Sequence, residues 1–98
     1  GGRYAQALFD LALETGRLEP VRADLNSLKA AWIDSADLRR LATSPIMASE
    51  DQVKGLVAIA DKARFDATTR NFLGLLAQNG RARDLAAVIG GFERLYSA

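Results

Sequence analysis

Asp10 and Glu14 are two carboxylates at helical spacing, and they are the candidates in this sequence for acid–base chemistry. Residues four apart meet on one face of a helix, so one carboxyl group could act as an acid beside the other. Acidic side chains mostly line exposed surfaces, however, and we interpret the pair as part of a solvated helix face. The sequence therefore does not indicate a helical enzyme, and we expect no catalytic residues.

Composition limits nucleophilic and metal chemistry more directly. The 98 residues include no histidine and no cysteine. Ser-His and Cys-His arrangements therefore cannot be built, and most transition-metal sites would lack ligands. The sequence also contains no phosphate-binding loop of the GxGxxG or GxxxxGK[ST] type. We expect no metal, no cofactor and no bound nucleotide.

The charge balance argues against a nucleic-acid partner. Thirteen basic and twelve acidic residues give a net charge of +1. Arg81 and Arg83 form too short a basic cluster to change this balance, and we place them in a solvated turn between helices. A DNA-binding helix-turn-helix module needs a basic recognition helix, which we do not find. No apolar run approaches the ~20 residues of a membrane span, and no signal peptide is visible, so we expect no direct membrane insertion.

The apolar residues of segment 3–15 suggest that it binds another helix. On a helical wheel, its core-facing stripe consists of Ala5, Leu8, Phe9, Ala12 and Leu13. Tyr4, Ala7 and Leu11 lie on an adjoining face, although a helix on the surface of a small bundle usually has a narrower apolar arc. The segment is either central within its own bundle or in contact with a partner, and periodicity alone leaves both open.

Segment 66–79 has a similar excess of apolar residues, because Leu75 points away from the inward stripe and lies near Asn71 and Asn79. If the two segments lie side by side, Leu75 joins Tyr4, Ala7 and Leu11 in one shallow groove. Ala7 would let a partner backbone approach closely, and Asn71 could orient that backbone by hydrogen bonds. This arrangement would suit helix-in-groove recognition of an amphipathic helix.

The elements that position these residues are all predicted to be helices. Apolar residues recur at helical spacing, and β-branched runs with a period of two are missing. We expect one all-α domain over residues 1–98, a six-helix bundle with short connections. The predicted helices cover 3–15, 20–34, 35–43, a segment from Ser49, 66–79 with Asp66 as N-cap, and a segment from Asp84.

Individual residues set several of these boundaries. We expect Gly16 and Gly80 to end helices, since glycine tolerates the left-handed conformation found there. Pro20 suits a first helical position, where its missing N–H would be unpaired anyway. Ser49 and Gln52 fit a capping box, in which each side chain satisfies the other's backbone donor.

Two features of the sequence leave alternatives open. Gly90 and Gly91 permit either close packing against a neighbouring helix or a bend in the last helix. Trp32 ends the apolar stripe of the second helix and is expected to be a partly buried core aromatic. Alternatively, Trp32 borders a groove and would report partner binding by its fluorescence.

Four segments together resemble the family of the F-type ATP synthase delta subunit, whose mitochondrial counterpart is the oligomycin-sensitivity-conferring protein. Residues 3–12 (RYAQALFDLA) resemble the opening helix of that family, and residues 71–81 (NFLGLLAQNGR) resemble its fifth helix and the following turn. Residues 41–46 (LATSPI) and 92–96 (FERLY) also fit. The resemblance covers nearly the whole chain and implies a six-helix bundle that forms the N-terminal domain of a longer subunit, with the C-terminal domain absent.

The resemblance implies a function in the stator, or peripheral stalk, of a complex that couples hydrogen ion transport to ATP synthesis. This non-catalytic module would bind the N-terminal helix of an alpha subunit between its first and fifth helices and hold the catalytic head against rotation. The partner-binding residues carried over are Tyr4, Ala7, Leu8, Leu11, Asn71, Leu75 and Asn79. Leu8 lies on the border between core and groove.

Further expectations follow from the same resemblance. Stalk b subunits would bind through the missing C-terminal domain. The complex would lie at the cytoplasmic side of a bacterial inner membrane or the matrix side of the mitochondrial one, and the sequence leaves the source open. It also leaves open whether Gly1 and Gly2 are native or a cloning remnant. The alternatives are a helix-binding adaptor of another assembly and a helical DNA-binding module.

Overall fold

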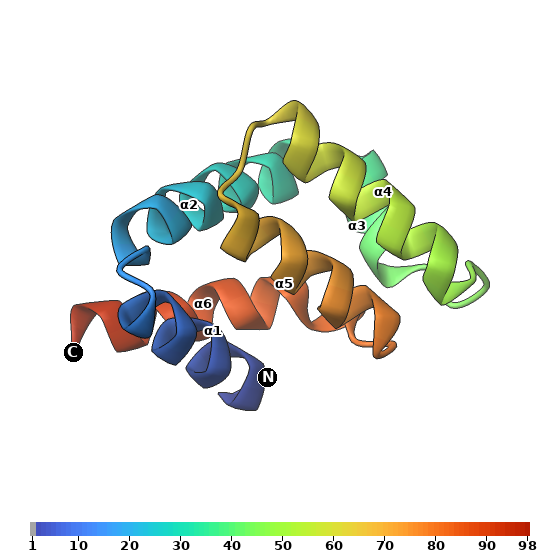
Figure 1. Cartoon of the computed structure of the whole chain (residues 1–98). Coiled ribbons are helices and arrows are strands. Elements are labelled where there is room, and N and C mark those ends of the chain that lie inside the picture. Colours follow the sequence, from blue (N-terminus) through green and yellow to red (C-terminus); the bar gives the residue numbers. More distant parts are fainter. Residues whose placement is uncertain (1) are drawn as a thin grey trace.

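The computed structural model describes residues 2–98, which form six α-helices and contain no strand (Figure 1). The predicted all-α class is thereby confirmed. The helices are α1 (Gly2–Glu14), α2 (Leu18–Asp34), α3 (Ala36–Thr43), α4 (Ser49–Lys62), α5 (Ala67–Gln78) and α6 (Leu85–Ser97), and a short 3-10 turn, η1 (Ala82–Asp84), precedes α6. Gly1 lies outside the described residues.

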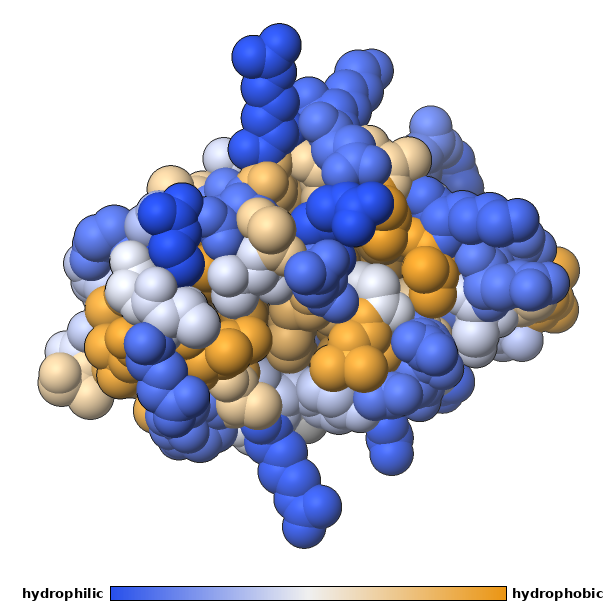
Figure 2. Space-filling model, viewed as in Figure 1, coloured by the Kyte–Doolittle hydropathy of each residue, from blue (hydrophilic) through white to orange (hydrophobic). Residues whose placement is uncertain are grey.

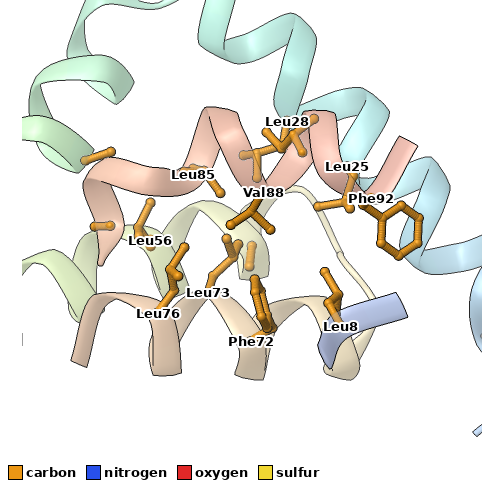
Figure 3. Packing of buried hydrophobic residues seen from close by; sticks show 14 of the residues in the cluster. Leu8, Leu25, Leu28, Leu56, Phe72, Leu73, Leu76, Leu85, Val88 and Phe92 are labelled. Atoms are coloured by element: carbon orange, nitrogen blue, oxygen red, sulfur yellow. The ribbon is translucent and has the colours of Figure 1, made fainter. Parts of the chain in front are cut away.

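Two helix pairs, α4 with α5 and α1 with α6, make the most extensive contacts. In Figure 1, α5 crosses the middle of the molecule, with α2 above it to the left, α6 passing behind it and α1 below it. Large apolar side chains from α1, α2, α4, α5 and α6 meet in one core (Figure 3). Leu8, Leu28, Leu73 and Phe92 are each at most 1% exposed. Each such side chain contributes roughly 1.5–3 kcal/mol by leaving water.

The contact between α1 and α6 decides between the two roles considered for the glycine pair. A Cβ atom added at Gly91 would lie 2.8 Å from the Cβ of Ala5. At Gly90, the nearest atom to an added Cβ is Nη1 of Arg94, at 3.5 Å, an ordinary contact. α6 is continuous through both residues. Gly91 therefore permits close packing of two helices.

The glycine and aspartate boundaries are confirmed. Gly16 and Gly80 end their helices with φ values of 68° and 73°, in the left-handed region. Asp66 caps α5, because its side chain accepts a hydrogen bond from the Thr68 backbone N–H at 2.9 Å. α2 begins two residues before Pro20, which still lies in the first turn, where backbone N–H groups have no partner within the helix.

The predicted capping box of Ser49 and Gln52 is wrong. Ala48 is the N-cap of α4, and no side chain caps that end. The Gln52 amide instead donates hydrogen bonds to the backbone oxygens of Leu41 at 3.1 Å and Ala42 at 3.4 Å. These carbonyls end α3 and have no partner within their own helix. Gln52 therefore forms hydrogen bonds to the end of another helix instead of the predicted capping box.

Candidate functional site

α1 and α5 lie next to each other, as the predicted groove requires. The ring of Tyr4 packs edge-on against Phe72, with their centroids 6.3 Å apart, and its hydroxyl accepts a hydrogen bond from Nδ2 of Asn79 at 3.3 Å. Just beyond the other end of α1, Nε of Arg17 donates to Asp66 at 2.8 Å. The start of α1 is thus near the end of α5, and its end near the start of α5, so the two helices run antiparallel.

Apolar side chains remain uncovered on both α1 and α5. Leu11 on α1 is 45% exposed and Leu75 on α5 is 49% exposed. Ala7, one turn before Leu11, is also exposed, as is Asn71, one turn before Leu75. Figure 2 shows apolar side chains reaching the surface over α1 and over the region of α5 and α4, among polar side chains. We call the surface formed by Tyr4, Ala7, Leu11, Asn71 and Leu75 the α1/α5 face.

Leu8, one of the predicted partner-binding residues, does not reach the surface. Its side chain is 0% exposed and belongs to the core. A helical wheel places Leu8 at the edge of the core stripe, and only the position of α5 and α6 determines that the edge is covered. Leu8 therefore cannot contact a partner directly. Leu13, expected in the core, is exposed instead.

Two hollows flank the place where α1 meets α5. Tyr4 and Ala7 line one of them, together with Arg3 from α1 and Arg81 and Asp84 from the turn after α5. Asn71, Gly74 and Leu75 line the other, against Val53 and Val57 of α4. Tyr4 and Ala7 thus line one hollow, and Asn71 and Leu75 line another that extends onto α4, whereas Leu11 lines neither.

Sequence reasoning missed Val53 and Val57 as parts of this surface. Their spacing with Leu56 and Ala60 is typical of a core stripe, and Leu56 and Ala60 are indeed fully buried. Val53 and Val57 are only partly buried, and they line the hollow together with Gly74. A Cβ at Gly74 would lie 3.5 Å from Cγ2 of Val57. The sequence signal for this surface was Gly74, a glycine within the apolar segment 72–77.

A polar network fixes the start of α5 and thus one end of the face. Hydrogen bonds from the Arg17 guanidinium and the Thr68 backbone N–H hold the pKa of Asp66 below its ordinary value. Oδ2 of Asp24 accepts from the Asp66 backbone N–H at 2.8 Å and from the Thr69 hydroxyl at 2.7 Å. These bonds connect α2, α5 and the turn after α1.

A second apolar hollow lies between α2 and α6 and was not anticipated. Trp32, Ile33, Ile89 and Gly90 contribute to its lining, and Ile33 is 67% exposed. Trp32 therefore borders a hollow, but on a pair of helices different from α1 and α5. We therefore do not expect the fluorescence of Trp32 to report binding of a partner to the α1/α5 face.

The candidate acid–base pair shows no arrangement for catalysis. Asp10 and Glu14 are exposed, and Oδ1 of Asp10 accepts a hydrogen bond from Nε2 of Gln6 at 2.9 Å. No cluster of acidic side chains in residues 2–98 could hold a metal ion. Within the same residues, no helix has the length and apolar character needed to span a bilayer.

Comparison with known proteins identifies the family. The model of the ATP synthase delta (OSCP) subunit family matches residues 1–98. This chain belongs to that family. The resemblance seen in segments 3–12 and 71–81 is thereby confirmed.

Bacterial members of the delta family are similar over almost the entire chain. ATP synthase subunit delta of Phenylobacterium zucineum is 62% identical over 93 residues, which are 95% of this chain and 50% of that protein. The subunit delta of Caulobacter vibrioides is 56% identical over 95 residues, covering 97% of this chain and 52% of that protein. The chain thus spans about half the length of the curated relatives it matches.

A solved structure shares the fold. A chain in the cryo-EM structure of the Toxoplasma gondii mitochondrial ATP synthase hexamer superposes with a TM-score of 0.85 and 36% identity. The match covers 94% of this chain and 51% of that chain. The fold of this chain is therefore also found in a chain of a mitochondrial ATP synthase.

Proposed function

We propose that this chain is the N-terminal domain of a delta-type stator subunit and binds the N-terminal helix of an alpha subunit on its α1/α5 face. The observation that carries the proposal is the pair of exposed leucines, Leu11 and Leu75, on neighbouring antiparallel helices. Membership in the delta (OSCP) family supports the stator assignment. The domain itself has a mechanical, non-catalytic role: it holds the catalytic head so that the head does not turn with the rotor.

The chemistry of the face suits an amphipathic helix. Leu11 and Leu75 offer apolar contacts from two sides, and Ala7 leaves space for a close backbone approach. Asn71 supplies hydrogen-bonding groups at the rim. Each large apolar side chain buried on docking contributes roughly 1.5–3 kcal/mol before the costs of association are subtracted. A few such side chains from each partner support a long-lived complex.

The supporting structure keeps this face in place. Tyr4 is fixed by Phe72 and Asn79, so it forms a rigid border between α1 and α5. Asn79 contributes to the face through this hydrogen bond to Tyr4. A preformed surface loses less conformational entropy on binding than a flexible one.

The remaining assignments concern the complete subunit. In the complete subunit, stalk b subunits would bind through a C-terminal domain. The subunit would lie at the periphery of a membrane-bound complex, and the similarity to bacterial delta subunits favours the cytoplasmic side of a bacterial inner membrane.

Titration with a peptide tests the proposed partner. The N-terminal segment of the cognate alpha subunit, about 20 residues or roughly 30 Å of helix, is added to the isotope-labelled chain. We expect chemical-shift changes concentrated on α1 and α5. The variant Leu75→Glu is expected to bind at least about tenfold more weakly, because about 1.4 kcal/mol of apolar contact corresponds to a factor of ten.

The control for this variant is Ile33→Glu, which introduces the same charge at another exposed apolar position, on α2. It is expected to bind the peptide as the unaltered chain does. Helical circular dichroism of both variants is expected to stay unchanged, because neither side chain belongs to the core. Undiminished binding by the double variant Leu75→Glu, Ala7→Trp would show that the face is misplaced.

A further inference from the structure

α1 carries its charges in the order that its own helix dipole disfavours. A helix has a partial positive charge at its start and a partial negative charge at its end, so acidic residues stabilise the first turn and basic residues the last. α1 has no acidic residue in its first turn and no basic residue in its last turn. Arg3 stands near the start and Glu14 is the last residue. The stability of α1 does not explain this order.

The same charges lie along one edge of the α1/α5 face. At 100° per residue, Arg3, Asp10 and Glu14 fall within about 40° of one another on α1. Ala7 lies on the same side of the helix, next to Leu11. The edge is thus basic where α1 begins and acidic where it ends, and it borders the apolar positions on which a partner helix would rest.

The basic end is reinforced from a second element. Arg81, in the turn after α5, lines the same hollow as Arg3, Tyr4 and Ala7. The salt bridges formed by residues 2–98 involve neither Arg3 nor Arg81. Asp84 also lines this hollow and offsets one of the two positive charges. The hollow therefore keeps a net positive charge, and neither guanidinium group is held in a salt bridge, so each can bind a carboxylate with two parallel hydrogen bonds.

We propose that the α1/α5 face selects a partner helix with a carboxylate facing Arg3 and Arg81 and a cationic side chain facing Asp10 and Glu14. This inference rests on the proposed function and specifies the orientation and register of the docked helix. Arg3 and Glu14 are eleven positions apart, about 16 Å along a helix. The matching acidic and basic residues of the partner are therefore separated by about two to three helical turns on one side of its apolar stripe.

Charge-removing variants test this pairing with the peptide of the alpha subunit as the probe. The double variant Arg3→Gln, Arg81→Gln is expected to bind about five- to tenfold more weakly at low salt, since each exposed ion pair contributes up to a factor of about five. The difference is expected to shrink to less than about twofold near 1 M salt, where the screening length is only about 3 Å. Because Arg3 opposes the dipole of α1, the thermal unfolding midpoint is expected not to fall.

The matched control is Lys54→Gln, Lys62→Gln, which removes two positive charges from exposed positions on α4. It is expected to leave both the affinity and its salt dependence unchanged. A loss in this control equal to that of the arginine variant would contradict the proposal, since it would show a general effect of net charge. Equal binding by the arginine variant and the unaltered chain would likewise overturn it.

A second pair of probes tests the orientation independently. One alpha-subunit peptide has its acidic and basic residues exchanged, with the apolar residues and net charge retained. The exchanged peptide is expected to bind more weakly or in the reversed direction, which a spin label at one peptide end reveals by broadening signals of α1. Binding of both peptides with the same affinity and direction would refute the charge inference and leave the proposed function intact. Failure of the natural peptide to bind would instead refute the proposed function.

Discussion

Two adjacent glycines in α6 differ in what surrounds them. Gly91 faces Ala5 so closely that an added methyl group would lie 2.8 Å from another fixed methyl group. Gly91→Ala is therefore expected to lower the free energy of unfolding by about 1–3 kcal/mol, as overpacking of a core does. Thermal denaturation monitored by circular dichroism measures the change, since 1 kcal/mol corresponds to about 4–8 °C in a domain of this size.

Gly90→Ala is the matched control for this prediction. The added methyl group meets only the flexible end of Arg94 at 3.5 Å, and alanine favours helix by about 1 kcal/mol over glycine. Gly90→Ala is thus expected to raise the unfolding midpoint while Gly91→Ala lowers it. Midpoints that move in the same direction would contradict the packing interpretation of Gly91.

Single residues also show where sequence reasoning reaches its limit. The predicted exposure of Leu75 and Ala7 follows from helical periodicity, and the structure agrees. The burial of Leu8 does not follow, because it depends on which helices cover the edge of the stripe. Likewise, Gln52 could not be assigned to the end of α3 from local spacing, because the contact joins residues ten and eleven positions away in another helix.

At the level of elements, the N-cap of α5 makes stability depend on pH. The Asp66 carboxylate accepts hydrogen bonds from Arg17 and Thr68, which lower its pKa in the folded chain from the ordinary value near 3.8. The group therefore stabilises the fold fully above about pH 4 and loses this contribution as the pH falls through the lowered pKa. We expect the free energy of unfolding to decrease over this acidic interval.

The variant Asp66→Asn separates this contribution from that of other carboxylates. It keeps an oxygen for the Thr68 N–H but cannot carry the charge that pairs with Arg17, so the acid-induced loss is expected to be smaller. The control is Asp10→Asn, because the Asp10 carboxylate is exposed and accepts a hydrogen bond from a neutral amide. Its free energy of unfolding is expected to depend on pH as that of the unaltered chain does. Urea titrations between neutral pH and pH 3 measure the three curves.

Element boundaries were largely predictable because they depend on local backbone chemistry. Gly16 and Gly80 need the left-handed region, and Asp66 accepts a hydrogen bond from a nearby backbone donor. Besides the wrong capping box of α4, one exception is the beginning of α2, because two helical residues precede Pro20. Proline is tolerated throughout the first turn, so it does not fix the starting position.

For the whole molecule, the separation of two apolar surfaces leads to a spectroscopic prediction. Trp32, the only tryptophan, lines the α2/α6 hollow, whereas the proposed partner binds on α1 and α5. Its fluorescence maximum is expected to stay constant when the alpha-subunit peptide binds. It is expected to move to longer wavelength when the chain unfolds, because the partly buried indole then enters water.

Fluorescence and circular dichroism recorded on the same samples check this prediction. A shift of the Trp32 emission on peptide addition, without a change in helicity, would indicate binding at the α2/α6 hollow. Saturation of α1 and α5 chemical shifts at constant emission is the expected result. Trp32 would then serve as a probe of folding rather than of partner binding.

The arrangement of the helices could not be derived from their individual patterns. Amphipathic stripes indicate that each helix has a buried side, but they do not say that α5 packs along α4 or α1 along α6. The expectation that α1 and α5 lie side by side followed from the family resemblance. The hydrogen bond between Asn79 and Tyr4 is one contact that joins the two segments. The extension of the face onto α4 required the structure, because Val53 and Val57 have the spacing of core residues.

The close contact between Ala5 and Gly91 also limits how the sequence can evolve. Two helix backbones that approach this closely leave room for only one methyl group between them. A larger residue at either position would force α1 away from α6 and displace the Tyr4 border of the α1/α5 face. Positions 5 and 91 should therefore covary in size among proteins with this packing, so that a gain of volume at one is accepted only with a compensating loss at the other.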